Sequence, residues 1–152
     1  MPVEVEDTIR ALDHLVDRMG RASLAIAAQG ARMVNVGARA LAPIGLELPH
    51  RTGTPGDLAR SIRTTGPVPS GRGAYTAHVG PTVIYGRQRE LGGPIAPVFA
   101  RRLRWWAMDG TPIFARHVVQ FPHPYLKPAA EAVRHRYRDL AIRRWGDAIR
   151  RA

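Results

Sequence analysis

Apolar and small residues recur at alternating steps of three and four along the first part of the chain. They form two columns of one helix face: Leu12, Met19, Ile26, Met33 and Ala40 in the first, and Ile9, Val16, Ser23, Gly30 and Gly37 in the second. This spacing is typical of an amphipathic helix, and Pro43 is positioned to end it. We therefore predict a helix over residues 5–41.

The second column becomes smaller toward its C-terminal end. Small side chains let another backbone approach closely, whereas glycine costs about 1 kcal/mol relative to alanine inside a helix and marks bends. A continuous helix with a close neighbour and a helix broken near Gly20 or Gly30 both remain open. The polar faces lack the paired charges of a coiled coil, so we expect this helix to pack against a sheet.

The next segment, residues 42–73, is rich in proline and glycine and is expected to be mostly loop. Within it, "DLARSIRTT" allows two readings. Asp57 caps a short helix, or Leu58 and Ile62 anchor a turn.

The period then changes to two, and residues 74–120 are predicted to form a sheet. Tyr75, Ala77 and Val79 alternate with polar residues, and "TVIYG" at 82–86 is rich in β-branched and aromatic residues. Asp109 and Gly110 separate two strand-like arms, which is a strong hairpin signal because both residues tolerate positive φ.

A second helix is predicted over residues 128–150. One face carries the apolar residues Val133, Tyr137, Leu140, Ala141, Trp145, Ala148 and Ile149, and arginines occupy the others. The fold class is therefore α+β: a long N-terminal helix, a small mostly antiparallel sheet with a β-hairpin, and a C-terminal helix. A length of 152 residues fits a single domain spanning 1–152.

Composition narrows the class of protein. The chain has no cysteine, which excludes disulfides and thiolate metal sites. No run approaches the roughly 20 apolar residues of a membrane span, and the acidic start "MPVEVEDTIR" lacks the layout of a signal peptide. We expect a soluble protein made in a cytoplasm, with no membrane partner.

The net charge of +11 is unevenly distributed. Arginine supplies 22 of the 23 basic residues, which indicates either contact with nucleic acid or another polyanion, or a GC-rich genome. Residues 1–17 carry −4 and the rest of the chain +15. The acidic end either complements a helix dipole or docks on a basic neighbour in a ring or stack.

No pattern of catalytic residues emerges. The six histidines show no metal-ligand spacing, and the chain contains neither a nucleophile elbow nor a P-loop. We therefore assign no catalytic, cofactor-binding or metal residues and expect a protein that is not an enzyme.

The segment "RRLRWWAM" combines arginines with adjacent tryptophans. Strand alternation would put Arg102, Arg104 and Trp106 on one face, with Leu103 and Trp105 on the other. Such a segment either stacks on single-stranded nucleic acid or places one tryptophan in the core and one at a subunit contact. We favour the second.

Three boxes in order give the chain a resemblance to a known family. They are Ala42, Pro43, Thr52, Gly53, Leu58, Ser61 and Ile62; then Tyr85, Glu90 and Gly92; then Pro124, Tyr125, Leu126, Pro128 and Ala129. In this order the chain resembles the neck or tail-completion family of long-tailed double-stranded DNA bacteriophages. The inserted "TPG" before Asp57, and tyrosine at position 125 where the family favours phenylalanine, depart from its pattern.

The resemblance implies a virion structural protein at the head-to-tail junction, synthesised in the host bacterial cytoplasm. It would form a ring of six copies around the DNA channel and contact other head-completion and tail proteins. A tail terminator that caps the tail tube, and a small basic non-specific DNA-binding protein, are the alternatives.

This interpretation supplies the candidate site residues. The candidate subunit or partner contacts are Trp105, Trp106, Tyr125, Leu126, Tyr85 and Glu90. The candidate contacts with double-stranded DNA or another polyanion are Arg101, Arg102, Arg104, Arg134, Arg138, Arg143 and Arg144. Pro124 and Pro128 would preset the connector that carries Tyr125 and Leu126, which lowers the entropy cost of burying them in the core or in a neighbouring subunit.

Overall fold

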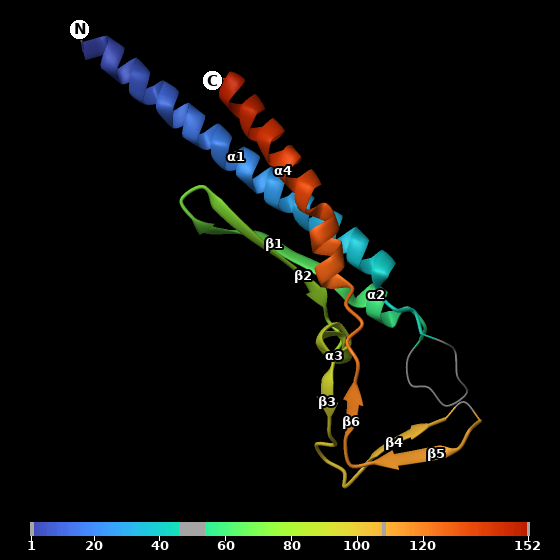
Figure 1. Cartoon of the computed structure of the whole chain (residues 1–152). Helices are drawn as coiled ribbons and strands as arrows, with labels where there is room; N and C mark the ends of the chain where they lie inside the picture. Colours follow the sequence, from blue (N-terminus) through green and yellow to red (C-terminus); the bar gives the residue numbers. More distant parts are fainter. Residues whose placement is uncertain (1, 46–53, 108, 152) are drawn as a thin grey trace. The chain divides into compact units, whose positions relative to one another are not determined.

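The computed structural model describes residues 2–45, 54–107 and 109–151, with side chains from residue 5 onward. Its elements are α1 (Pro2–Leu41), α2 (Asp57–Ser61), β1 (Ile62–Gly71), β2 (Ala74–Pro81), α3 (Tyr85–Leu91), β3 (Gly93–Ile95), β4 (Leu103–Trp106), β5 (Pro112–Ala115), β6 (Val118–Gln120) and α4 (Leu126–Arg150) (Figure 1). The predicted α+β class is confirmed. The described strands form three two-stranded sheets, β1–β2, β3–β6 and β4–β5.

The chain contacts divide into two compact units. Unit 1 comprises residues 1–36, 64–79 and 130–152, and unit 2 comprises residues 37–63 and 80–129. Each therefore combines segments that lie far apart in the sequence. The expectation of a single domain stays a prediction.

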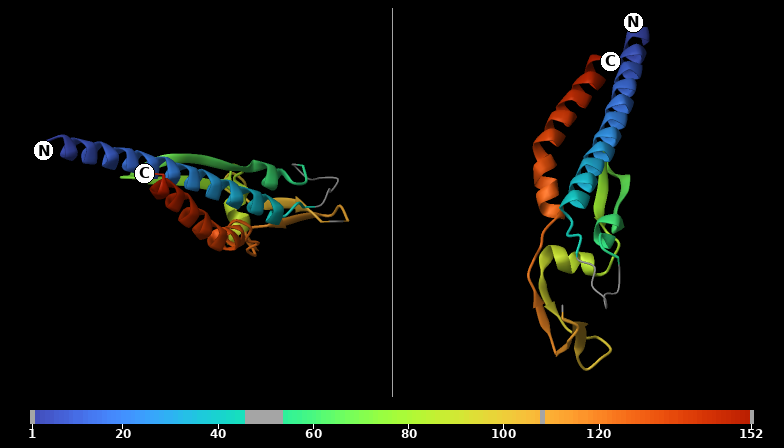
Figure 2. Two further views of the ribbon diagram at one scale, coloured as in Figure 1. Left: turned by 90° about the horizontal axis from the view of Figure 1, so that it is seen from above. Right: turned by 90° about the vertical axis from the view of Figure 1, so that its right-hand side faces the viewer.

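In unit 1, α1 and α4 run side by side in opposite directions (Figures 1 and 2). Their buried residues are Ile26, Ala27, Ala31, Leu140 and Ala141. The small column of α1 makes this packing close, since a Cβ on Gly30 would overlap the ring of Tyr137. Helix α4 thus occupies the space that glycine leaves open in this column, whereas the expected contact of α1 with a sheet is made at another part of the helix, through Asn35 and strand β1.

The β1–β2 hairpin also belongs to unit 1. Asn35 of α1 donates from Nδ2 to Thr64 Oγ1 of β1 at 3.1 Å. The second strand confirms the strand predicted around Tyr75, although burial does not alternate along it. The first strand, Ile62–Gly71, overturns part of the loop expected within residues 42–73, because proline is tolerated in a two-stranded ribbon, where each strand has a free edge.

The long helix is continuous. α1 runs without interruption past Gly20 and Gly30, so the alternative of a break is wrong. Packing against α4 stabilises the element beyond what its residue propensities supply.

In unit 2 the buried side chains are those of Ala38, Ala42, Leu58, Ile62, Tyr125 and Ala129, together with Ser61, and Gly86 of α3 is buried as well. Tyr125 and Ile62 are fully buried. The predicted strand over 82–86 is wrong here: Tyr85 begins α3, and the Gly86 N–H donates to the Val83 carbonyl at 3.0 Å. Tertiary contacts of α3 override the β-propensity of "TVIY".

The predicted hairpin at Asp109–Gly110 is confirmed by β4 and β5, with Arg104 opposite Phe114 and Trp105 opposite Ile113. Its turn differs from the prediction that both Asp109 and Gly110 would have a positive φ. Gly110 has φ of +82°, whereas no described residue other than glycine has a positive φ. The carboxylate of Asp109 instead accepts from the Thr111 N–H at 2.9 Å, and the pKa of this exposed carboxyl is lowered by that backbone donor.

Candidate functional site

The strongest polar cluster of unit 2 joins the second and third sequence boxes at the start of α4. Oε2 of Glu90 accepts from the N–H groups of Tyr125 at 2.7 Å and Leu126 at 3.0 Å. Oε1 accepts from the Lys127 N–H at 2.9 Å. The first amides of a helix have no partner within that helix, so Glu90 of α3 caps α4 from 35 residues away in sequence.

The charge of Glu90 also suits this position. Burial by itself raises the pKa of Glu90, but the three backbone donors outweigh burial and lower the pKa below 4.5. A carboxylate at the positive end of a helix is further favoured by the helix dipole. The group therefore stays ionised at neutral pH and holds the start of α4.

Tyr125 completes the connection to α3. Its hydroxyl donates to the Gly86 carbonyl at 3.2 Å. Burial raises the pKa of Tyr125 to about 12, with smaller contributions from the charges of Glu90 and Tyr85. Gly86 and Glu90 lie one helical turn apart, so a single face of α3 binds both ends of Tyr125.

Gly86 is surrounded closely enough to explain its identity. A Cβ there would collide with the ring of Pro81 and approach Leu58 Cδ1 to 3.3 Å. Gly92, which ends α3 with φ of +68°, is also required: its Cβ would lie 2.8 Å from the Gln120 carbonyl oxygen.

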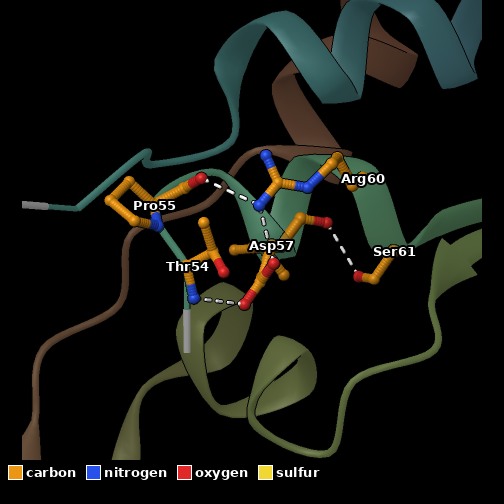
Figure 3. Close-up of polar contacts among 6 residues, drawn as sticks. Thr54, Pro55, Asp57, Arg60 and Ser61 are labelled. Carbon is orange, nitrogen blue, oxygen red and sulfur yellow. Dashed lines mark hydrogen bonds and ion pairs between the residues drawn. The ribbon is translucent and has the colours of Figure 1, made fainter. Parts of the chain in front are cut away.

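The first box enters unit 2 through α2 and its preceding loop (Figure 3). The Asp57 carboxylate accepts from the Thr54 N–H at 2.6 Å and from Arg60 Nη2 at 2.7 Å, and Ser61 Oγ donates to the Leu58 carbonyl at 2.7 Å (Figure 3). The residue before α2 is Gly56, so Asp57 is inside the helix rather than its cap. Both earlier readings hold in part, because α2 forms while Leu58 and Ile62 are buried.

All described residues of the three boxes belong to unit 2, while Thr52 and Gly53 lie outside the described residues. The second and third boxes are joined by hydrogen bonds from the start of α4 to Glu90. Leu58 of the first box lies close to Gly86 in α3, the helix that carries the second box. The described residues of the boxes therefore meet in unit 2 through buried and hydrogen-bonded contacts.

The predicted contact residues divide by exposure. Tyr125 is 0% exposed, whereas Glu90 is half-buried and accepts from backbone donors of its own chain, so both make contacts within unit 2, and their role at a subunit contact stays a prediction. Leu126 is half-buried, whereas Tyr85 is exposed beside an open cleft. That cleft has a volume of about 530 Å³ and includes Arg60, Arg89 and Gln120 in its lining.

The tryptophans lie on the β4–β5 hairpin. The guanidinium of Arg104 stacks 4.7 Å from the centre of the Trp106 ring, which confirms that the two share a face. Trp105 is 38% exposed and Trp106 is half-buried. Neither ring is fully buried among the described residues, so the structure does not show the expected tryptophan in the core, and the expected subunit contact stays a prediction.

The predicted polyanion contacts are all exposed arginines, but they occupy different units. Arg101, Arg102 and Arg104 lie in unit 2, and Arg134, Arg138, Arg143 and Arg144 lie on α4 in unit 1. Arg144 also lines a groove of about 290 Å³ with Arg18, Arg21 and Arg151. Sequence reasoning missed those last three because the groove forms only when α1 and α4 pack together.

Two further observations concern the described residues. Among its described residues, no three histidine, aspartate or glutamate side chains gather into a group that would hold a metal ion. None of the described helices is sufficiently long and apolar to span a bilayer.

Comparison with known proteins adds no relative. No protein-family model, curated protein sequence or solved structure matches this chain. Interpretation of its function therefore depends on its own residues and geometry.

Proposed function

We propose that the chain is a virion structural protein of the head-to-tail junction of a long-tailed double-stranded DNA bacteriophage, a neck or tail-completion protein. The observation that carries this proposal is the convergence of the three motif boxes on one core. Their order along the chain suggested the family, and their contacts in unit 2 give every box a structural purpose.

A role in assembly agrees with the surface of the chain. Val98 and Phe99 are 83% and 102% exposed, and Phe114 and Phe121 are also exposed. Large apolar side chains in contact with water are typical of surfaces that other proteins cover. We infer that the β4–β5 hairpin, with Trp105 and Trp106, contacts a neighbouring copy or another head-completion or tail protein.

The proposed assembly is a ring of six copies around the DNA channel, located at the head-tail junction of the virion. The exposed arginines would then contact the phosphates of genomic double-stranded DNA without reading its sequence. Such contacts need neither a cofactor nor a catalytic group.

Two alternatives keep specific support. A tail terminator would use the same exposed apolar surfaces to cap the tail tube. A small basic DNA-binding protein is favoured by the groove lined by Arg18, Arg21, Arg144 and Arg151, and its affinity for DNA would fall steeply with salt.

The deciding experiment is to delete the gene for this chain from its phage and image the particles by cryo-electron microscopy, with the wild-type gene supplied in trans as the control. We expect filled heads and tails of normal length that remain unjoined, and complete particles with density for this chain at the junction on complementation. Overlong tails would instead assign the tail terminator function. Complete infectious particles without the chain would refute both structural roles.

A further inference from the structure

The face of α1 that packs on α4 continues beyond the end of α4. Ser23 Oγ accepts from Nε1 of Trp145 at 3.2 Å, and Gly30 contacts Tyr137, so successive members of one α1 column follow α4 toward its C-terminal end. Figures 1 and 2 show α1 extending past that end. The uncovered continuation of this face consists of Val5, Ile9, Leu12 and Val16, which we name the open stripe.

The open stripe is apolar and solvent-exposed. Its four side chains are between 53% and 65% exposed. Their steps of four, three and four residues put them on one side of the helix, along roughly 18 Å at 1.5 Å per residue. That spacing suits the apolar face of a second helix.

The charges around the open stripe disfavour pairing with the open stripe of a second copy. Glu6, Asp13 and Asp17 follow one flank of the stripe, and residues 2–17 carry −4. Two copies paired through their open stripes would bring these like charges together, which is unfavourable for association. A basic helix is the complementary partner.

The chain itself contains such a helix. α4 carries seven basic and three acidic residues, a balance of +4. Its exposed side presents Ile142 and Ile149, which are 59% and 56% exposed. Arg138 and Arg134 lie one and two turns before Ile142 along this face, and we name these four residues the basic stripe.

We propose that the open stripe of one copy docks on the basic stripe of a second copy. This contact joins two different surfaces, so each copy uses its open stripe to bind one neighbour and its basic stripe to bind another. Repeated contacts of this kind close into a ring when the rotation between successive copies adds up to a full turn. It deepens the ring proposed above and rests on that proposal for its place in the particle. The acid-rich end of α1 is thereby assigned to the subunit contact.

Charge reversal tests the contact in the purified full chain. Asp13→Arg with Asp17→Arg, and separately Arg134→Glu with Arg138→Glu, should each weaken self-association at least about 100-fold in sedimentation velocity, because like charges would then face each other. Mixing the two variants should restore assembly, since each supplies the complement of the other. Arg63→Glu with Arg87→Glu, at exposed positions in unit 2, is the matched control and should leave association unchanged.

Cysteine cross-linking provides an independent test, because the native chain has no cysteine. Ile9→Cys combined with Ile142→Cys should give a ladder of covalent multimers on oxidation. Ile142→Cys alone should stay uncross-linked. Dimers from Ile9→Cys alone would show pairing of two open stripes and overturn the proposal.

The remaining outcomes separate this contact from the proposed function. Assembly that survives both charge reversals, or a wild-type chain that stays monomeric up to about 1 mM, an affinity too weak for a specific contact, overturns the contact. Loss of DNA binding without loss of assembly in Arg134→Glu with Arg138→Glu would assign this face to DNA instead. If the contact between the two stripes is refuted but particles still contain the chain, the proposed role at the head-tail junction is unaffected. If the contact is verified but the chain is absent from particles, only the role at the junction is refuted.

Discussion

Replacing Glu90 with alanine removes one carboxylate that three backbone amides share. In Glu90→Ala the N–H groups of Tyr125, Leu126 and Lys127 lose their acceptor oxygens. Lys127 is exposed and Leu126 is half-buried, so water can reach their amides. Tyr125 is fully buried, and its amide has no such replacement at hand.

The expected cost follows from these differences. Loss of a helix cap costs about 0.5–2 kcal/mol, and leaving a buried donor unsatisfied costs about 1–3 kcal/mol. Since the two overlap, we expect Glu90→Ala to lower the free energy of unfolding of the structure that contains this cap by about 2–4 kcal/mol. Glu90→Gln keeps one acceptor oxygen without the charge and should cost about 1–2 kcal/mol.

Urea unfolding followed by circular dichroism measures this free energy, and hydrogen exchange at residues 125–127 reports the loss locally. Asp139→Ala, at an exposed position within α4, is the control and should change stability by less than about 0.5 kcal/mol. A change below about 0.5 kcal/mol in Glu90→Ala, with unaltered exchange at Tyr125, would refute the capping role of Glu90.

Three further predictions use the same unfolding assay. Gly20→Ala should stabilise α1 by about 0.5–1 kcal/mol, because no described atom lies within 4 Å of the added methyl group. Gly30→Ala should instead destabilise by about 1–3 kcal/mol, since its methyl group overlaps the ring of Tyr137; equal effects at the two sites would contradict the close helix packing. Because the folded pKa of Glu90 is lowered, its contribution to stability is fully present above pH 4.5 and should disappear as the pH falls through that lowered pKa. Glu90→Gln should lose less stability than the wild type between neutral and acidic pH, and identical pH profiles would contradict the shift.

Particular elements show how far sequence reasoning reached. The period of α1 and α4, and the Asp109–Gly110 signal between β4 and β5, are local patterns, and both helices and the hairpin were predicted. The β1 strand and α3 were missed, because proline and β-branched residues there contradict the conformation that their neighbours stabilise.

The candidate site shows the same division. The sequence singled out Glu90 and Tyr125 separately, through boxes 35 residues apart, as candidate contacts with a subunit or partner, with the core as the other possibility for Tyr125. Only the structure shows the hydrogen bonds that place both inside unit 2. The groove lined by Arg18 and Arg144 had no linear signal at all, since its residues come from opposite ends of the chain.

By itself, the sequence determined the elements that depend on local periodicity, the acidic start and basic end of the chain, and the order of the three boxes. The tertiary structure decided which faces become buried, because burial depends on partners that are distant in sequence. Thus the ring of Tyr137 occupies the space beside Gly30, while Ile9 and Leu12, on the same helix face, stay exposed. The difference arises because α4 ends before it reaches them, and no residue within α1 records where its partner helix stops.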